Sequence, residues 1–116
     1  MGRAARADPG IAATLLMRFD VHRVSRLGGR LVLNVQSEFH DHLATRVVVP
    51  LIPLSAYQGG QQERLEPILS IDGQRYFLQT THVGAVRASE LGSPIASLAD
   101  QHSAIVDALD FLFQGF

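Results

Sequence analysis

Apolar and polar residues alternate along the first part of the chain with the two-residue period of β-strands. Residues 17–22 predict a strand with one buried face, in which Asp20 and His22 lie on the polar side. The same alternation returns in residues 31–36, after the turn signal Gly28-Gly29. The two segments together predict a β-hairpin.

Further strands are predicted in the middle of the chain. Residues 46–52 are apolar and rich in β-branched side chains, which is typical of a central strand, and we expect this strand to stop at Pro50. Asp72-Gly73 separates two more apolar runs and predicts a tight hairpin, because both turn positions need φ > 0. Residues 83–91 predict one more strand.

The hydrophobic period changes near the C-terminus. Apolar residues recur there at the spacing of one helical face, namely Ile105, Ala108, Leu109, Leu112 and Phe113. Asp100 is the expected N-cap of this helix, and Gly115 stands where a helix commonly ends. The pattern as a whole predicts a mainly β domain, an antiparallel sheet followed by one C-terminal helix.

We expect the domain to span residues 17–116, behind an N-terminal extension of residues 1–16. The extension carries two arginines and then an apolar run, in the rough order of a secretory signal. Pro9-Gly10 interrupts that order, and no small-residue cleavage site follows. The extension is therefore expected to be flexible, or to reflect a start assigned too early, with Met17 as the natural start.

Composition excludes several classes of protein. The chain has no cysteine, which rules out disulfides and thiolate metal sites and suits a reducing cytoplasm. Its ten basic residues, all arginine, face eleven acidic ones, and a net charge of -1 disfavours direct binding to nucleic acid. No apolar run reaches the roughly 20 residues that span a bilayer. We expect neither membrane contact nor a cofactor.

Five short stretches stand in a recognisable order over residues 17–116. They are Val35-Gln36-Ser37, Arg46-Val47-Val48-Val49-Pro50-Leu51, Leu65-Glu66-Pro67, Thr80-Thr81 and Phe113-Gln114-Gly115-Phe116. No stretch is specific alone, but their collinearity resembles the CcdB toxins of bacterial toxin–antitoxin systems. The resemblance implies a barrel-like antiparallel sheet of the SH3-like type shared with MazF ribonucleases. It also implies a small accessory sheet, a C-terminal helix and a homodimer.

The same resemblance implies a function. CcdB toxins are not enzymes; they bind the A subunit of DNA gyrase and trap the gyrase–DNA cleavage complex, which blocks replication and transcription. A CcdA-type antitoxin neutralises the toxin. The operator DNA of the module is bound only indirectly, through the complex of toxin and antitoxin.

By the same resemblance, the gyrase-binding residues lie at the end of the helix and in one loop. The family ending Trp-Gly-Ile corresponds to Gln114, Gly115 and Phe116, so the usual aromatic anchor is replaced by Gln114. Ser37, Phe39 and His40 occupy a loop that the family also brings near gyrase. Phe39 fits either an exposed contact or a residue that closes the core, and the core is favoured.

Asp110 lies one helical turn before the end of the chain. It fits the edge of the same gyrase-binding surface, and it also fits an ordinary solvated position on a helix, which is favoured. The replacement of the family tryptophan by Gln114 leaves two outcomes open, a retuned toxin or one that has lost potency.

Three alternatives remain beside this interpretation. His40-Asp41-His42 could chelate a metal from a strand, but no third ligand has useful spacing. A MazF-like endoribonuclease would need a base and a phosphate stabiliser, for which Arg46 or Arg75 with Thr45 or Thr80 are the candidates. A non-toxic homologue would only bind its antitoxin and regulate its operon.

Overall fold

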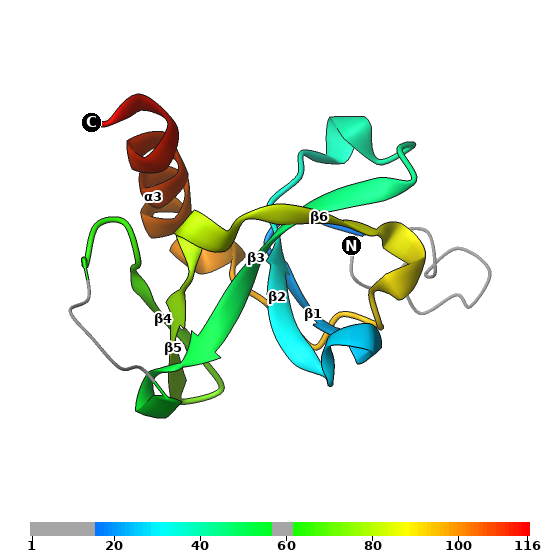
Figure 1. Cartoon of the computed structure of the whole chain (residues 1–116), viewed down its shortest axis with the longest axis horizontal. Helices are drawn as coiled ribbons and strands as arrows, with labels where there is room; N and C mark the ends of the chain where they lie inside the picture. The colour runs from blue at the N-terminus through cyan, green and yellow to red at the C-terminus, as the bar shows by residue number, and fades with distance from the viewer. Residues whose placement is uncertain (1–15, 57–61) are drawn as a thin grey trace.

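The computed structural model describes residues 16–56 and 62–116, and Figure 1 shows a mainly β molecule with one α-helix at the C-terminal end. The strands are β1 (Asp20–Val24), β2 (Arg30–Asn34), β3 (Thr45–Pro53), β4 (Ile68–Ile71), β5 (Gln74–Leu78), β6 (Gly84–Arg87) and β7 (Ala96–Ser97). The α-helix is α3 (His102–Gln114). Short 3-10 helices join them: η1 (Ser25–Leu27), η2 (Glu38–His40), η3 (Leu54–Ala56), η4 (Thr80–His82), η5 (Ala88–Glu90) and η6 (Ala99–Gln101). The predicted fold class is confirmed.

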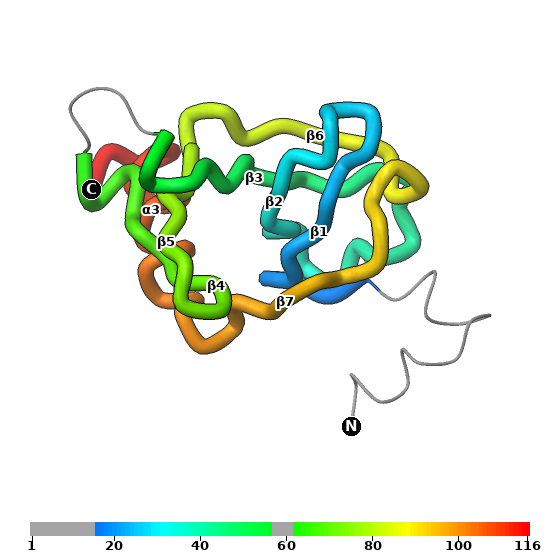
Figure 2. Tube along the Cα trace, turned by 90° about the horizontal axis from the view of Figure 1, so that it is seen from below, coloured from blue at the N-terminus to red at the C-terminus, as the bar shows by residue number. Residues whose placement is uncertain are grey.

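The strands form an antiparallel sheet that curls into a nearly closed barrel. Its order is β4-β5-β3-β2-β1-β7, and β6 pairs with the first half of β3. A bridge between Val24 and Leu91 joins β1 to the chain that follows β6, which brings the two edges of the barrel together. The second half of β3 pairs with β5, and β5 with β4, so these strands make the predicted accessory sheet. Figure 2 shows this sheet beside α3, at one end of the molecule.

Pro50 lies inside β3, so the prediction that the strand stops there is wrong. Strand residues direct their backbone groups alternately to either side. Val47 faces β2, because its carbonyl accepts from the Val35 N–H at 3.0 Å, and Pro50 therefore faces away from β2. On that side the pairing partner of β3 changes from β6 to β5. The Pro50 carbonyl accepts from the Gln79 N–H at 2.9 Å. The missing N–H of Pro50 thus interrupts no pairing with β2.

Both faces of the central strands are buried. The main core lies on the face covered by α3 and includes Leu33, Leu51 and Ile105, while Val24, Val32, Val48 and Val86 fill the barrel on the other face. Asp20 and His22, predicted on the polar side of a half-buried strand, are fully buried. That prediction is wrong because the barrel closes over their face, where His22 Nδ1 lies 2.7 Å from the Gly92 carbonyl oxygen.

The sequence predicted turns more reliably than it predicted where helices and strands begin. Asp72 and Gly73 have φ of 50° and 81°, which confirms the tight hairpin. Asp100 is not the N-cap of α3: η6 runs directly into the helix, whose N-cap is Gln101 without a side-chain cap bond. The first strand begins at Asp20 rather than at residue 17, since Phe19 takes a positive φ of 71° where the chain turns.

Residues 1–15 of the predicted extension, and residues 57–61, lie outside the described residues. Leu16, the last residue of that extension, is 7% exposed and therefore buried. The domain boundary at Met17 stays a prediction. Within residues 16–56 and 62–116, no helix is both long enough and apolar enough to cross a membrane.

Candidate functional site

The C-terminal end of α3 carries two exposed aromatic rings. Phe113 is 71% exposed and Phe116 is 72% exposed, and Gln114 and Gly115 between them are exposed as well. Residues 113–116 are called the helix tip below. Figure 1 shows the end of α3 extending beyond the strands. Phe113 lies on the apolar face that the spacing predicted, but its side chain is exposed because the buried part of that face ends before the last turn.

Gly115 gives the helix tip its shape. Its φ of 80° lies in the left-handed region, and its N–H donates to the Phe111 carbonyl at 2.9 Å, so it ends the helix as predicted. A Cβ at this position would meet no atom within 4 Å. Glycine is therefore favoured here by backbone conformation rather than by lack of space.

The rest of α3 is fixed firmly to the body of the protein. Ile105 and Ala108 are buried in the core. Just before the helix, the Gln101 side-chain amide accepts from the Ser70 N–H at 3.1 Å and donates to the Ser70 carbonyl at 2.9 Å. This pair of bonds ties the start of the helix to β4.

Arg64 makes a second attachment farther along α3. Its guanidinium donates to the two carboxylate oxygens of Asp107 at 3.0 and 3.2 Å, and its Cζ lies 4.5 Å from the centre of the Phe111 ring. The hydrogen bond to Asp107 raises the pKa of Arg64. These contacts hold α3 as far as Phe111, so the helix tip projects from a fixed base.

Phe39 is the second exposed aromatic site. It lies in η2 and is 90% exposed, so the expectation that it closes the core is wrong. The Ser37 Oγ accepts from the Phe39 N–H at 3.2 Å and begins the short helix, which carries the ring away from the sheet. Ser37, Glu38 and Phe39 line an open hollow of about 270 Å³. His40 beside them is exposed.

The structure brings the predicted residues together in two groups. Asp110 is exposed on α3 one turn before Gln114, so it lies beside the helix tip. Ser37, Phe39 and His40 form the other group. Figures 1 and 2 agree that α3 and the loop of Phe39 lie at opposite ends of the molecule. A single chain therefore offers two separate surfaces.

The residues considered for ribonuclease chemistry do not gather in one accessible site. Arg46 is 3% exposed and pairs with Val86 at one end of β3, whereas Arg75 lies on β5, which pairs with the other end of β3. Thr80 is fully buried, and its Oγ1 lies 3.4 Å from the Leu78 carbonyl oxygen. Thr45 is exposed beside Arg46, but their contact is a hydrogen bond from the buried guanidinium to the Thr45 backbone carbonyl at 2.9 Å rather than an arginine–hydroxyl pair.

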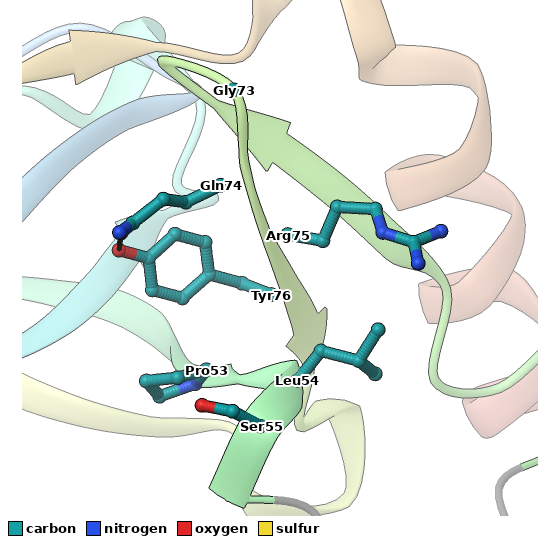
Figure 3. A pocket seen from close by; sticks show the side chains of 7 residues that line it. All are labelled: Pro53, Leu54, Ser55, Gly73, Gln74, Arg75 and Tyr76. Atoms are coloured by element: carbon teal, nitrogen blue, oxygen red, sulfur yellow. Dashed lines mark hydrogen bonds between the residues drawn. The ribbon is translucent and has the colours of Figure 1, made fainter.

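Arg75 does line a cavity, of about 510 Å³, in the accessory sheet (Figure 3). The other lining residues are Pro53, Leu54, Ser55, Gly73, Gln74 and Tyr76. The Tyr76 hydroxyl donates to Gln74 Oε1 at 3.0 Å. Arg75 and Tyr76 extend to opposite sides of β5 in Figure 3, so the cation and the hydroxyl do not converge on one point.

His40-Asp41-His42 does not form a chelating strand. Asp41 Oδ1 accepts from the Arg46 guanidinium at 2.9 Å, and both histidines lie exposed on the loop. Within the described ranges, no group of three histidine, cysteine or acidic side chains could hold a metal ion.

Pattern analysis missed two residues that shape these surfaces. Phe113 belongs to the run Phe111-Leu112-Phe113, which places more apolar side chains at the end of the helix than one face can bury. Arg46 was considered only for catalysis. Its position inside an apolar strand was the signal that it is buried and paired.

Comparison with known proteins places this geometry in a family. The family model described as CcdB protein matches residues 18–115. An endoribonuclease from a mycobacterial species superposes with a TM-score of 0.68 at 17% identity, covering 84% of this chain and 90% of that one. A mycobacterial endoribonuclease solved with its cognate antitoxin gives 0.70 at 16% identity, covering 85% and 95%. The Mycobacterium tuberculosis toxin MazF-mt6 gives 0.65 at 21% identity, covering 81% and 95%.

Proposed function

The chain belongs to the CcdB protein family, and on this premise we propose that it is the toxin of a type II toxin–antitoxin module. Its target is the A subunit of DNA gyrase, and its action is to trap gyrase on cleaved DNA. The protein acts by binding and performs no chemistry of its own.

The observation that carries this proposal is the helix tip. The family match runs through Gly115, and Phe113 and Phe116 are each more than two-thirds exposed at the end of a fixed helix. Burying an aromatic ring of this size is worth about 1.5–3 kcal/mol. Because the tip is already folded, little conformational entropy is lost when it enters a groove. These properties are those of a binding hot spot.

Gln114 changes the chemistry of the tip without removing its apolar surface. It stands where the family usually has tryptophan, and Phe113 and Phe116 on either side of it supply aromatic area in its place. We propose that these two phenylalanines, with Gly115 between them in the chain, bind gyrase, and that Asp110 lies at the rim of the contact. The loop of Ser37, Phe39 and His40 forms the second contact.

The partners follow from the same premise. The proposed homodimer presents each of the two surfaces twice. A CcdA-type antitoxin neutralises the toxin, and operator DNA is reached through it, in keeping with a net charge of -1. The fold is shared with a mycobacterial endoribonuclease that binds its cognate antitoxin, which supports a partner of this class.

The ribonuclease alternative rests on the fold alone. Structural neighbours below 25% identity are named endoribonucleases, but Arg46 is buried, and Arg75 and Thr80 do not form a site with it. Gyrase poisoning is therefore favoured over RNA cleavage.

Deletion of residues 114–116 tests the proposal in cells and in vitro. We expect the shortened protein to lose toxicity on expression in its host while keeping its thermal stability and its oligomeric state, because the deleted residues are exposed. A folded, truncated protein that still kills would overturn the role of the tip. A full-length chain that binds an antitoxin peptide but leaves growth unchanged would identify a non-toxic homologue.

A further inference from the structure

Arg46 is buried, and its guanidinium donates hydrogen bonds to the loop that follows Phe39. Its Nη2 donates to the Asp41 carbonyl at 2.6 Å and to Asp41 Oδ1 at 2.9 Å. Its Nη1 donates to the Thr45 carbonyl at 2.9 Å and to the Leu43 carbonyl. All these acceptors lie between Asp41 and Thr45, just after η2.

The position of Arg46 on β3 explains how it reaches this loop. It shares a face of the strand with Val48, whose side chain lies inside the barrel. The guanidinium therefore closes the end of the barrel, and the loop folds over it. The Gln36 side chain adds a second attachment, because it donates to the His40 carbonyl at 2.9 Å and accepts from the Val47 N–H at 3.0 Å.

Neither the buried arginine nor the exposed phenylalanine is what fold stability alone would favour. A buried ion pair is often no better for stability than apolar side chains of the same volume. A phenylalanine that is 90% exposed contributes little to a core. Together, however, they place an aromatic ring on a backbone that is held on both sides, and a fixed ring loses less entropy when a partner covers it.

We propose that Arg46 is a positioning residue: by binding the backbone of the loop from Asp41 to Thr45, it holds Phe39 in the orientation that a partner recognises. That the partner is the gyrase A subunit rests on the proposed function. The ordering of the loop by Arg46 does not.

The first test needs no partner. The chain contains no tryptophan, so Phe39→Trp introduces a single fluorescent probe at an exposed site. Time-resolved anisotropy is measured on this variant with and without Arg46→Met, which removes the guanidinium but keeps a long apolar side chain. We expect Arg46→Met to increase the amplitude of fast depolarisation while the overall tumbling stays unchanged. An unchanged fast component would overturn the proposal.

The second test is a double-mutant cycle in binding to the gyrase A subunit, measured by titration calorimetry. We expect Arg46→Met to weaken the affinity about tenfold in the natural background and to have little further effect beside Phe39→Ala. Equal losses in both backgrounds would show that Arg46 acts elsewhere and would overturn the proposal. If the natural protein itself does not bind, the proposed function fails, and the anisotropy alone decides the role of Arg46.

Asp41→Asn is the second variant, in case Arg46→Met does not fold. It keeps the carbonyl acceptor of Asp41 and weakens only the bond to its side chain, which is 31% exposed. We expect a smaller change in the same direction in both measurements. No change in either would contradict the proposed role of the Arg46–Asp41 contact.

Discussion

Phe39, Phe113 and Phe116 are the three most exposed large apolar side chains of the described residues. Isolated apolar residues on a surface are ordinary. Aromatic rings this exposed are unusual at the end of a packed helix and on a hydrogen-bonded loop. Arg64 lies against Phe111, just before the helix tip, and Arg46 holds the backbone of the loop that follows Phe39. At the scale of single residues, the proposed binding is therefore assigned to these three rings.

We expect Phe113→Ala, Phe116→Ala and Phe39→Ala each to weaken binding to the gyrase A subunit by about tenfold or more. Because the rings are exposed, the free energy of unfolding should change by no more than about 0.5 kcal/mol. Calorimetric titration and urea denaturation measure the two effects. Leu27→Ala is the matched control, since Leu27 is 42% exposed on η1 and away from both surfaces. Equal loss in the control would contradict this account.

Gln114→Trp should strengthen binding. Gln114 is exposed between two phenylalanines, so a larger ring meets no packed neighbour and adds aromatic area to the tip. We expect the affinity for the gyrase A subunit to rise about tenfold or more, whereas Gln114→Ala should leave it nearly unchanged. A tryptophan variant that binds no better than the natural protein would mean that this tip does not bind gyrase as the family's Trp-Gly-Ile ending does.

At the scale of elements, the sequence predicted local turns well. It predicted poorly which strands pair and which side chains distant segments bury. Asp72-Gly73 requires positive φ whatever surrounds it, and the hairpin was predicted correctly. Pro50 ends a strand only if its missing N–H faces a paired strand. On that side the partner of β3 changes from β6 to β5, and residues near Pro50 in the sequence do not show this change. His22 was expected on a polar face because alternation cannot show that a barrel will cover it.

The sequence predicted only part of the candidate site, again because local patterns do not show which side chains the fold buries. The family resemblance located Gln114, Gly115 and Phe116 at the end of the helix. Periodicity placed Phe113 on the apolar face of the helix but could not show that it is exposed, because the pattern does not indicate where the helix extends beyond the sheet. The exposure of Phe39 depends on the turn that begins at Ser37 and on the attachment of the loop to Arg46, and the alternation of apolar and polar residues shows neither.

The contact between η1 and η5 predicts a dependence of stability on pH. Arg26 donates to Glu90 Oε2, and the Arg87 N–H donates to Glu90 Oε1 at 3.0 Å. The hydrogen bond from Arg26, followed by that from Arg87, lowers the pKa of Glu90. Folding therefore favours the ionised carboxylate, and this stabilisation is present above the ordinary pKa of glutamate and is lost as the pH falls through the lowered pKa.

We accordingly expect Glu90→Gln to be less stable than the natural protein at neutral pH and equally stable in acid well below the ordinary range of glutamate. Urea denaturation over that pH range measures the difference. Glu63→Gln, at an exposed position, controls for the loss of one negative charge. A difference that persists unchanged into acid would show that Glu90 acts through packing rather than through its charge.

At the scale of the whole molecule, one chain presents two surfaces with exposed aromatic rings at opposite ends, joined by a barrel whose central strands are buried on both faces. The fold is that of MazF-type toxins, but the arginines and threonines considered for RNA cleavage are buried or apart. The features left exposed are apolar and suited to contact with another protein. Family membership and these exposed surfaces both support the proposed mode of action, binding without catalysis.

The most direct test of this account is a gyrase reaction on plasmid DNA with ATP and the purified protein, using gyrase from the protein's own host. The products are treated with detergent and protease, and linear DNA is measured. We predict linear DNA above the level without toxin, and its loss when residues 114–116 are deleted. No linear product would contradict gyrase poisoning, and incubation of the same protein with RNA would then distinguish a ribonuclease from a non-toxic homologue.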